Sequence, residues 1–159
     1  MGNGHPVAAL ASPADIMAAF RRAFRCFNTF GGNPVSCVAA NAVMDVLISE
    51  DLPARAAATG AYLRAGLSRL AERHKVLGDI RGLGLAIGVE IVSDRAAKTP
   101  DAGVVGDLAN AMRQEGELLG TNGIYNNILK IRPPMPFGRD EADLLLDRLD
   151  KVLTAVPAR

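Results

Sequence analysis

The stretch with the clearest capacity for chemistry runs from residue 28 to residue 34 and reads Asn-Thr-Phe-Gly-Gly-Asn-Pro. Asn33 is a favourable helix N-cap, and Pro34 suits the first helical position because its missing N–H is not needed there. The stretch therefore predicts a helix that begins at Pro34. Such a helix start attracts anions, because its first backbone N–H groups have no partner within the helix.

The residues before this helix offer donors to an anion. Gly31 and Gly32 leave their backbone N–H groups unshielded by side chains, and Thr29 adds a hydroxyl within reach of the same spot. Donors of this kind in front of a helix are typical of phosphate-binding loops. The candidate anion-binding residues are therefore Thr29, Gly31, Gly32 and Asn33. The alternative is a flexible loop that merely caps a helix.

Long helices must carry this loop. From Pro34 to about residue 74, apolar residues recur at intervals of three and four, which is typical of amphipathic helices. The sequence Glu-Asp-Leu-Pro at 50–53 interrupts the pattern, so we expect two helices or one bent helix. Cys37 falls on the apolar side and is expected to be a small core residue.

The residues before the loop predict little structure of their own. Val7 to Leu10 reads as a short buried strand, and a helix follows from about residue 13 to Arg22. One strand and one short helix cannot enclose a core. We therefore expect this region to be the edge of something larger.

Residues 75–159 alternate between strand and helix patterns. Strands are expected within 77–92, at 117–120 and at 127–132, with helices ending near Gly116 and spanning about 139–155. Between 83 and 91, bulky apolar residues alternate with small ones, which indicates one apolar face. The order β-β-α-β-β-α predicts a small α/β domain, α+β-like, with an antiparallel sheet and helices on one face.

The composition excludes several classes of protein. The chain has 159 residues, 49% of them hydrophobic, and a net charge of +1, which gives no reason to propose nucleic acid or an anionic membrane as partner. No apolar run approaches the roughly 20 residues that cross a bilayer. The N-terminus lacks the features of a signal peptide, so a cytoplasmic location is expected.

Metal and nucleotide sites are also disfavoured. Cys26 and Cys37 stand alone, without the spacing of a zinc site or of a disulfide framework. The glycines at 82, 84 and 88 miss the GxGxxG spacing of a dinucleotide-binding loop. An autonomous nucleotide- or phosphate-binding protein would depend on these glycines alone, which is weak support.

Four motifs resemble the C-terminal part of the class III aminotransferases, which are pyridoxal-phosphate enzymes of fold type I. They are GNGHP at 2–6, NTFGGNP at 28–34, RGLGL at 81–85 and KIRPPM at 130–135, and they occur in the family's order. The resemblance implies a remnant of the cofactor-binding large domain at 1–33, connecting helices at 34–74 and a small C-terminal domain at 75–159. The variants GNGHP and KIRPP suggest the branch of alanine–glyoxylate-like transaminases and phospho-lyases that act on phosphorylated amines.

The resemblance implies roles for the candidate residues. Thr29 would hold the cofactor phosphate in a partner's active site, and the glycines and Asn33 would shape the loop. In the family, an arginine before the two prolines commonly clamps the substrate carboxylate, and that place falls here on Lys130. A lysine is a point charge and not a planar fork. Lys130 and Arg132 are two apart on a strand, so either or both could meet an anionic substrate, or each could be a solvated or interface charge.

The Schiff-base lysine of these enzymes sits just upstream of the GNGHP turn and is not in this sequence. None of the four lysines stands in a matching motif, so no catalytic residue is assigned. The leading expectation is part of an aminotransferase, which moves an amino group between an amino donor and an oxo acid. It would work as a homo-oligomer or with a complementary N-terminal polypeptide. The alternative is a non-catalytic dimerisation or interaction module.

Overall fold

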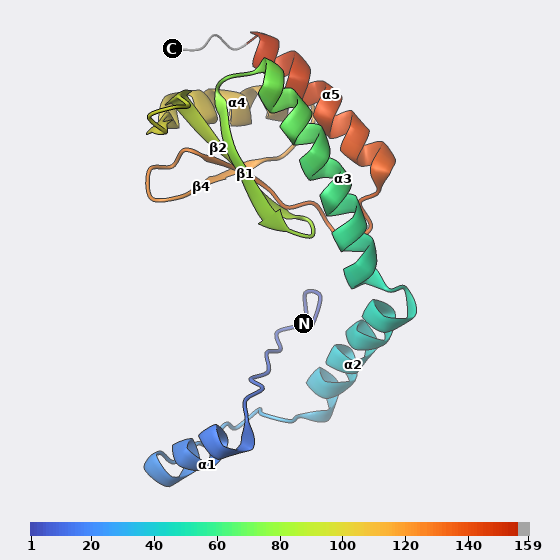
Figure 1. Ribbon diagram of the computed structural model, residues 1–159. Coiled ribbons are helices and arrows are strands. Elements are labelled where there is room, and N and C mark those ends of the chain that lie inside the picture. Colours follow the sequence, from blue (N-terminus) through green and yellow to red (C-terminus); the bar gives the residue numbers. More distant parts are fainter. Residues whose placement is uncertain (156–159) are drawn as a thin grey trace. The chain divides into compact units, whose positions relative to one another are not determined.

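The computed structural model describes residues 1–155, which divide into two compact units, residues 1–52 and the residues from Pro53 onward (Figure 1). Its helices are α1 (Ala14–Ala23), α2 (Pro34–Ser49), α3 (Leu52–Arg73), α4 (Ala102–Gln114) and α5 (Arg139–Ala155). Its strands are β1 (Leu77–Leu83), β2 (Ala86–Asp94), β3 (Thr99–Pro100), β4 (Gly120–Asn122) and β5 (Ile128–Ile131).

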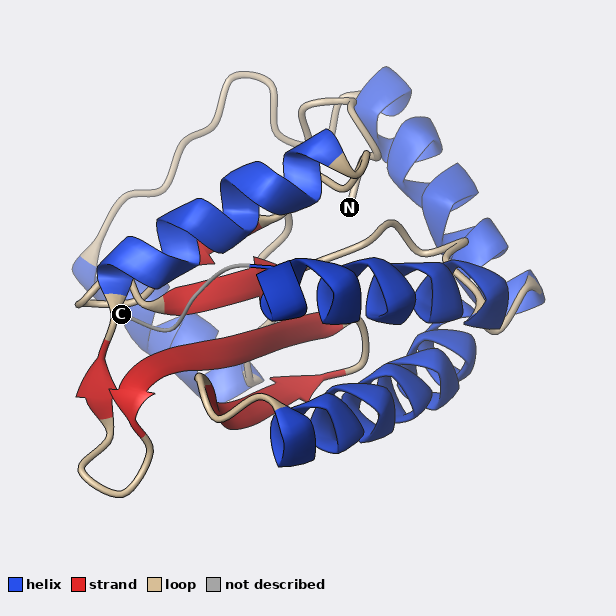
Figure 2. Ribbon diagram, turned by 90° about the horizontal axis from the view of Figure 1, so that it is seen from above, coloured by secondary structure: helices blue, strands red, loops and turns tan. Residues whose placement is uncertain are grey.

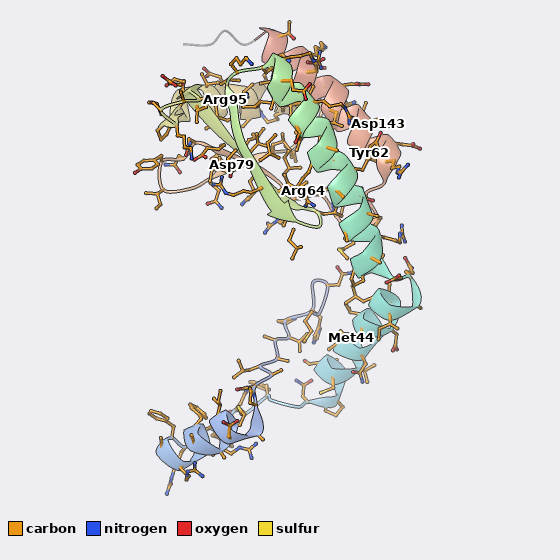
Figure 3. The ribbon with its side chains drawn as sticks, in the orientation of Figure 1. Met44, Tyr62, Arg64, Asp79, Arg95 and Asp143 are labelled. Carbon is orange, nitrogen blue, oxygen red and sulfur yellow. The ribbon has the colours of Figure 1, made fainter. Side chains whose placement is uncertain are left out.

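The first unit contains two helices that bury no residue. α2 begins at Pro34 with Asn33 as its N-cap, as the sequence predicts. The helices present large apolar side chains to solvent, among them Ile16, Phe20, Val35, Val38, Met44 and Ile48. Met44 is labelled on α2 in Figure 3. These residues have the spacing of a buried helix face, but nothing within residues 1–52 covers them.

Two expectations for this unit are wrong. Residues 7–10 form no strand, and Leu10 is 84% exposed. A strand needs a neighbour for its backbone N–H and C=O groups, and the first unit offers only helices and loops. Cys37 is exposed and not a core residue, since α2 buries none of its residues.

The second unit is built on an antiparallel sheet with the strand order β1-β2-β5-β4, and β3 pairs with β2 beside this path. Figure 2 shows these strands in red among the helices. The predicted order of two strands, a helix, two strands and a helix is confirmed, with the short β3 in addition. The predicted strand at 117–120 is displaced, because Glu117 remains tied to α4 by a bond from its N–H to Met112 O.

One face of the sheet packs on the helices. Ile87, Val89 and Ile91 of β2 are at most 2% exposed, while Gly88 and Glu90 point to the other face. Leu83 breaks the predicted alternation at 86% exposure, because the chain reverses at Gly84 and Leu83 ends β1. The cluster around this face is the core, formed with α3, α4 and α5 by Leu63, Leu67, Leu77, Leu108, Met112, Leu129, Ile131, Leu145 and Leu149.

Helices α3 and α5 lie side by side (Figures 1 and 3). Gly66 permits this approach, since a Cβ there would lie 2.2 Å from Cδ1 of Leu146. The Tyr62 hydroxyl donates to Asp143 Oδ1 at 2.6 Å, and this bond raises the pKa of Tyr62. The Arg139 guanidinium lies 5.0 Å from the Tyr62 ring centroid. The helix pair is thus joined by close packing and by a polar contact.

The C-terminus of α3 is capped by a side chain from the loop after β2. Nη2 of Arg95 donates to the carbonyl oxygens of Ala71 at 2.8 Å and His74 at 3.3 Å, and also to that of Leu77. The last carbonyls of a helix have no partner within the helix, and a cation there also complements the helix dipole. Arg95 therefore supports the connection between α3 and β1.

Arg95→Ala is expected to lower the free energy of unfolding by about 1–3 kcal/mol, because a charge-assisted donor to these carbonyls is lost. Chemical denaturation measures the effect. Arg95→Lys should recover only part of it, since an ammonium lacks the planar fork. The matched control is Lys98→Ala in the same loop, which removes a cation that forms no hydrogen bond or ion pair within the described residues. Equal effects of Arg95→Ala and Lys98→Ala would contradict the capping role.

A second tie joins the end of α3 to α5. Asp150 accepts from His74 Nε2 at 2.6 Å and pairs with Arg73 Nη1 at 3.0 Å. The hydrogen bond from His74, followed by that from Arg73, lowers the pKa of Asp150 below its ordinary value. A carboxyl group whose folded pKa is lowered stabilises the protein above its unfolded pKa of about 4, and this stability is lost as the pH falls through the folded pKa.

Asp150→Asn is therefore expected to destabilise the protein at neutral pH and to flatten its loss of stability below about pH 4. Denaturant titrations at a series of pH values measure both effects. Asp147→Asn on the same helix is the control, because Asp147 forms no hydrogen bond or ion pair within the described residues. A parallel pH profile for wild type and Asp150→Asn would contradict the assignment.

Candidate functional site

The loop before α2 is held by the side chain of Asn33. Asn33 Oδ1 accepts from the N–H of Ser36 at 2.9 Å, and Asn33 Nδ2 donates to Phe30 O at 2.8 Å and to Ser36 Oγ at 2.9 Å. The oxygen and the nitrogen of the Asn33 side-chain amide thus both form hydrogen bonds with the loop and the first turn of α2. Asn33 shapes the loop and caps the helix, and its side chain has little capacity left for a ligand.

Several backbone donors of the loop are also used internally. The N–H of Gly31 donates to Asn28 O at 3.3 Å, that of Asn33 to Phe30 O at 3.2 Å, and that of Phe30 to the Asn28 side chain at 3.2 Å. The Gly32 N–H and the Thr29 hydroxyl form no hydrogen bond within residues 1–155, and both residues are exposed. These two groups are among the donors that remain for an anion.

Gly32 has a backbone conformation that favours glycine, with φ at +73°, and nothing lies within 4 Å of the place where a Cβ would stand. The glycine therefore allows the turn and leaves its surroundings open. An incoming group can approach the Gly32 N–H without meeting a side chain there.

A histidine from the N-terminal turn reaches this loop. His5 Nε2 lies 2.9 Å from Ser36 Oγ, so His5, Ser36 and Asn33 form a continuous chain of hydrogen bonds. Sequence reasoning missed this pair. The two residues are 31 positions apart, and no periodic pattern links a turn to a helix start at that distance.

A cavity of about 750 Å³ lies between the N-terminal turn, the loop and the first turns of α2. His5, Gly31, Gly32 and Asn33 are among its lining residues, and Thr29 is not. The structure therefore brings three of the four predicted loop residues to one cavity. Thr29 offers its hydroxyl on the exposed surface outside it.

Lys130 lies in the middle of the sheet on the face away from the helices. Its neighbours on β5, Leu129 and Ile131, are buried in the core, so Lys130 must point to the opposite side. It pairs in register with Gly88 of β2 and Gly120 of β4. Lys130 is half-buried, and its ammonium forms no hydrogen bond or ion pair within residues 1–155.

Arg132 follows the end of β5 and is exposed. It lines a cavity of about 320 Å³ together with Glu117, Pro133 and Phe137, and Lys130 is not among the lining residues of that cavity. The structure thus places the two predicted substrate-binding cations in different surroundings. Each stays a prediction, with Lys130 on the open sheet face and Arg132 beside the apolar cavity.

The described residues offer neither a metal site nor a membrane-spanning helix. No group of three or more His, Cys, Asp or Glu side chains within residues 1–155 could hold a metal ion. No helix in the described part of the chain is both long and apolar enough to span a membrane.

Comparison with known proteins identifies the family. The family described as aminotransferase class-III matches residues 1–153. Over 94% of its length the chain is 42% identical to an alanine–glyoxylate aminotransferase 2 homolog of Arabidopsis thaliana, of which it covers 31%. Over 97% of its length it is 40% identical to an ethanolamine-phosphate phospho-lyase homolog of Caenorhabditis elegans, of which it covers 33%.

Solved structures agree. A phospholyase from Arthrobacter in complex with phosphoethanolamine matches 99% of this chain and 37% of its own, with a TM-score of 0.91 and 40% identity. An amine transaminase from an uncultivated Pseudomonas species, in its form with bound pyridoxal phosphate, matches 87% of this chain and 31% of its own, with a TM-score of 0.76 and 35% identity.

These matches confirm the resemblance seen in the sequence motifs. The chain spans about a third of the length of the curated relatives it matches. The Arabidopsis relative is named as mitochondrial, and the cytoplasmic location of this chain stays a prediction. Enzymes of the matched family use pyridoxal phosphate. With the antiparallel sheet, its helices and the loop before α2 all inside the matched region, this chain belongs to the class III aminotransferases.

Proposed function

We propose that this chain supplies the C-terminal part of a pyridoxal-phosphate enzyme that transfers an amino group between an amino donor and an oxo acid. The observation that carries the proposal is the loop at 28–33, which leaves the Thr29 hydroxyl and the Gly32 N–H available at the start of α2. A phosphate at this place would accept from both donors and would face the positive end of the helix dipole.

The cofactor's phosphate fits the chemistry of this loop. Asn33 and the internal bonds of Phe30 and Gly31 hold the loop's shape, so the free donors are ordered before a ligand arrives. When bound, pyridoxal phosphate supplies the aldehyde that takes up the amino group of the substrate. Thr29 and Gly32 would bind its phosphate, and Gly31 and Asn33 would hold the loop.

The covalent step needs an amine that the first unit does not contain. The first 74 residues include no lysine, and the four lysines of the chain are Lys75, Lys98, Lys130 and Lys151. None of the four stands in a motif that matches the reactive lysine of the family. The proposal therefore requires a reactive lysine from another polypeptide or another part of the protein.

The exposed apolar residues of the first unit support a covering partner. Phe24, Phe27 and Phe30 are 63%, 89% and 78% exposed, and large apolar side chains continue along α2. Extended apolar surface of this kind marks an interface. We propose a second copy of the chain or a complementary N-terminal aminotransferase polypeptide as the partner.

Lys130 favours a second candidate activity, that of a phospho-lyase on a phosphorylated amine. Its ammonium lies on the open sheet face, without a hydrogen-bond or ion-pair partner in the described residues, at the place the resemblance gives to the substrate's anionic group. A point charge with three donors suits a tetrahedral phosphate as well as a planar carboxylate. Two of the similar proteins are named for phosphoethanolamine chemistry, which agrees with this alternative.

Mixing the chain with pyridoxal phosphate and then desalting is expected to leave no visible absorbance band, because none of its four lysines stands in a motif that matches the reactive lysine of the family. Adding a polypeptide with the part of the Arthrobacter phospholyase that this chain does not cover should restore a band. That polypeptide alone, treated in the same way, is the control. A stable band and turnover from this chain by itself would overturn the proposal.

Asn33→Ala and Thr29→Ala are expected to separate the shape of the loop at 28–33 from its binding of the cofactor phosphate. Loss of the Asn33 cap should destabilise the start of α2 by about 1 kcal/mol, seen as faster hydrogen exchange at the Ser36 amide. Thr29→Ala should leave that exchange unchanged, because the Thr29 hydroxyl forms no hydrogen bond within the described residues. The same substitution should speed the loss of cofactor from the reconstituted enzyme. Unchanged cofactor release in Thr29→Ala would remove Thr29 from the phosphate site.

A further inference from the structure

We infer that Gly120 is a positioning residue for Lys130, and that the missing side chain at residue 120 is what lets the Lys130 ammonium lie over β4 to meet an anionic group. The inference rests on the proposed function, in which Lys130 binds the anionic end of the substrate. It adds that Gly120 of β4 determines where the Lys130 ammonium lies.

The contact itself carries the inference. A Cβ built on Gly120 would lie 3.2 Å from Cε of Lys130 and 3.8 Å from its Nζ. No other atom lies within 4 Å of that position. The end of the Lys130 side chain therefore occupies the space above Gly120, and the two residues are direct cross-strand partners in the register of β4 and β5.

The backbone gives no other reason for glycine at this position. Gly82, Gly84 and Gly123 have φ values of +146°, +54° and +92°, which residues other than glycine rarely adopt. Gly120 is not among the residues with positive φ, and it is the first residue of the short strand β4. A glycine in a strand often marks the close approach of another group. Here the approaching group is the lysine stem.

The charge of Lys130 is free to serve a ligand. The neighbouring cation on the same sheet face, Arg81, is held by Asp79 at 2.6 Å and by Glu90 at 3.5 Å. Lys130 has no such carboxylate partner among the described residues. A half-buried ammonium without a carboxylate beside it favours an external anion, such as a phosphate or a carboxylate.

The opposite flank of Lys130 provides a matched control. Gly88 of β2 is its partner on the other side, and a Cβ there would lie 3.1 Å from Cγ2 of Ile128 and within 4 Å of no Lys130 atom. Gly120→Ala and Gly88→Ala thus add the same methyl group to the same sheet face. Only the first is expected to disturb the ammonium.

The first experiment needs no ligand. In nuclear magnetic resonance spectra of the full chain, a cross-peak between Gly120 Hα and Lys130 Hε is expected, and the Lys130 Hε and Cε shifts should move in Gly120→Ala and not in Gly88→Ala. Absence of the cross-peak in the wild type would overturn the inference whatever the ligand does. The wild-type cross-peak can be measured even if a variant fails to fold.

The second experiment titrates the same proteins with inorganic phosphate and follows the Lys130 Cε signal. Gly120→Ala is expected to weaken the response about threefold, and Gly120→Val further, because the added groups displace the charge. Gly88→Ala should bind as the wild type does. Equal weakening in Gly120→Ala and Gly88→Ala would overturn the positioning role.

Lys130→Ala keeps this result separate from the proposed function. Because Lys130→Ala has no Lys130 signal and the loop at 28–33 can also bind phosphate, this titration follows the amide of Gly120, the partner of residue 130 on β4. Loss of the phosphate response at Gly120 in Lys130→Ala supports the anion role of Lys130. An unchanged response there would overturn that role and with it the proposed substrate site, while the cross-peak still decides whether Gly120 positions the lysine stem.

Discussion

The packing of one sheet face against three helices determines where the groups of the second unit lie. Leu129 and Ile131 are buried in that core, and because side chains alternate along a strand, Lys130 must stand on the other face. A shift of one residue in β5 would bury an ammonium and expose two core residues. The hydrophobic packing that stabilises the unit therefore also fixes the register of its exposed cation.

The first unit is held in a different way. Its helices bury no residue, so the shape of the phosphate loop depends on hydrogen bonds within it, chiefly those of Asn33, and on the contact between His5 and Ser36. Helices of this length are marginal in water unless an apolar face is covered. The proposed loop function and the proposed partner are therefore linked, because the surface that covers α2 also steadies the loop at its start.

Local signals in the sequence predicted local structure well. The N-cap at Asn33, the order of strands and helices and the inward face of β2 all follow from capping and periodicity, and they are confirmed. The prediction of a strand at residues 7–10 was wrong because an apolar run indicates burial but does not show which strand would pair with it. The first unit contains no such strand. The contacts of His5 with Ser36 and of Gly120 with Lys130 join distant positions, so only the fold reveals them.

The lysine at position 130 makes the surrounding strands more important than an arginine would. A guanidinium fixes the direction of a bound carboxylate through its own planar fork, whereas an ammonium is a compact charge on a flexible stem. Its position must come from what borders the stem. In this sheet Leu129 and Ile131 are anchored in the core, Gly120 leaves room on one side, and Ile128 stands beside Gly88 on the other. The direction of the charge is thus a property of three strands, β2, β4 and β5, and not of one residue.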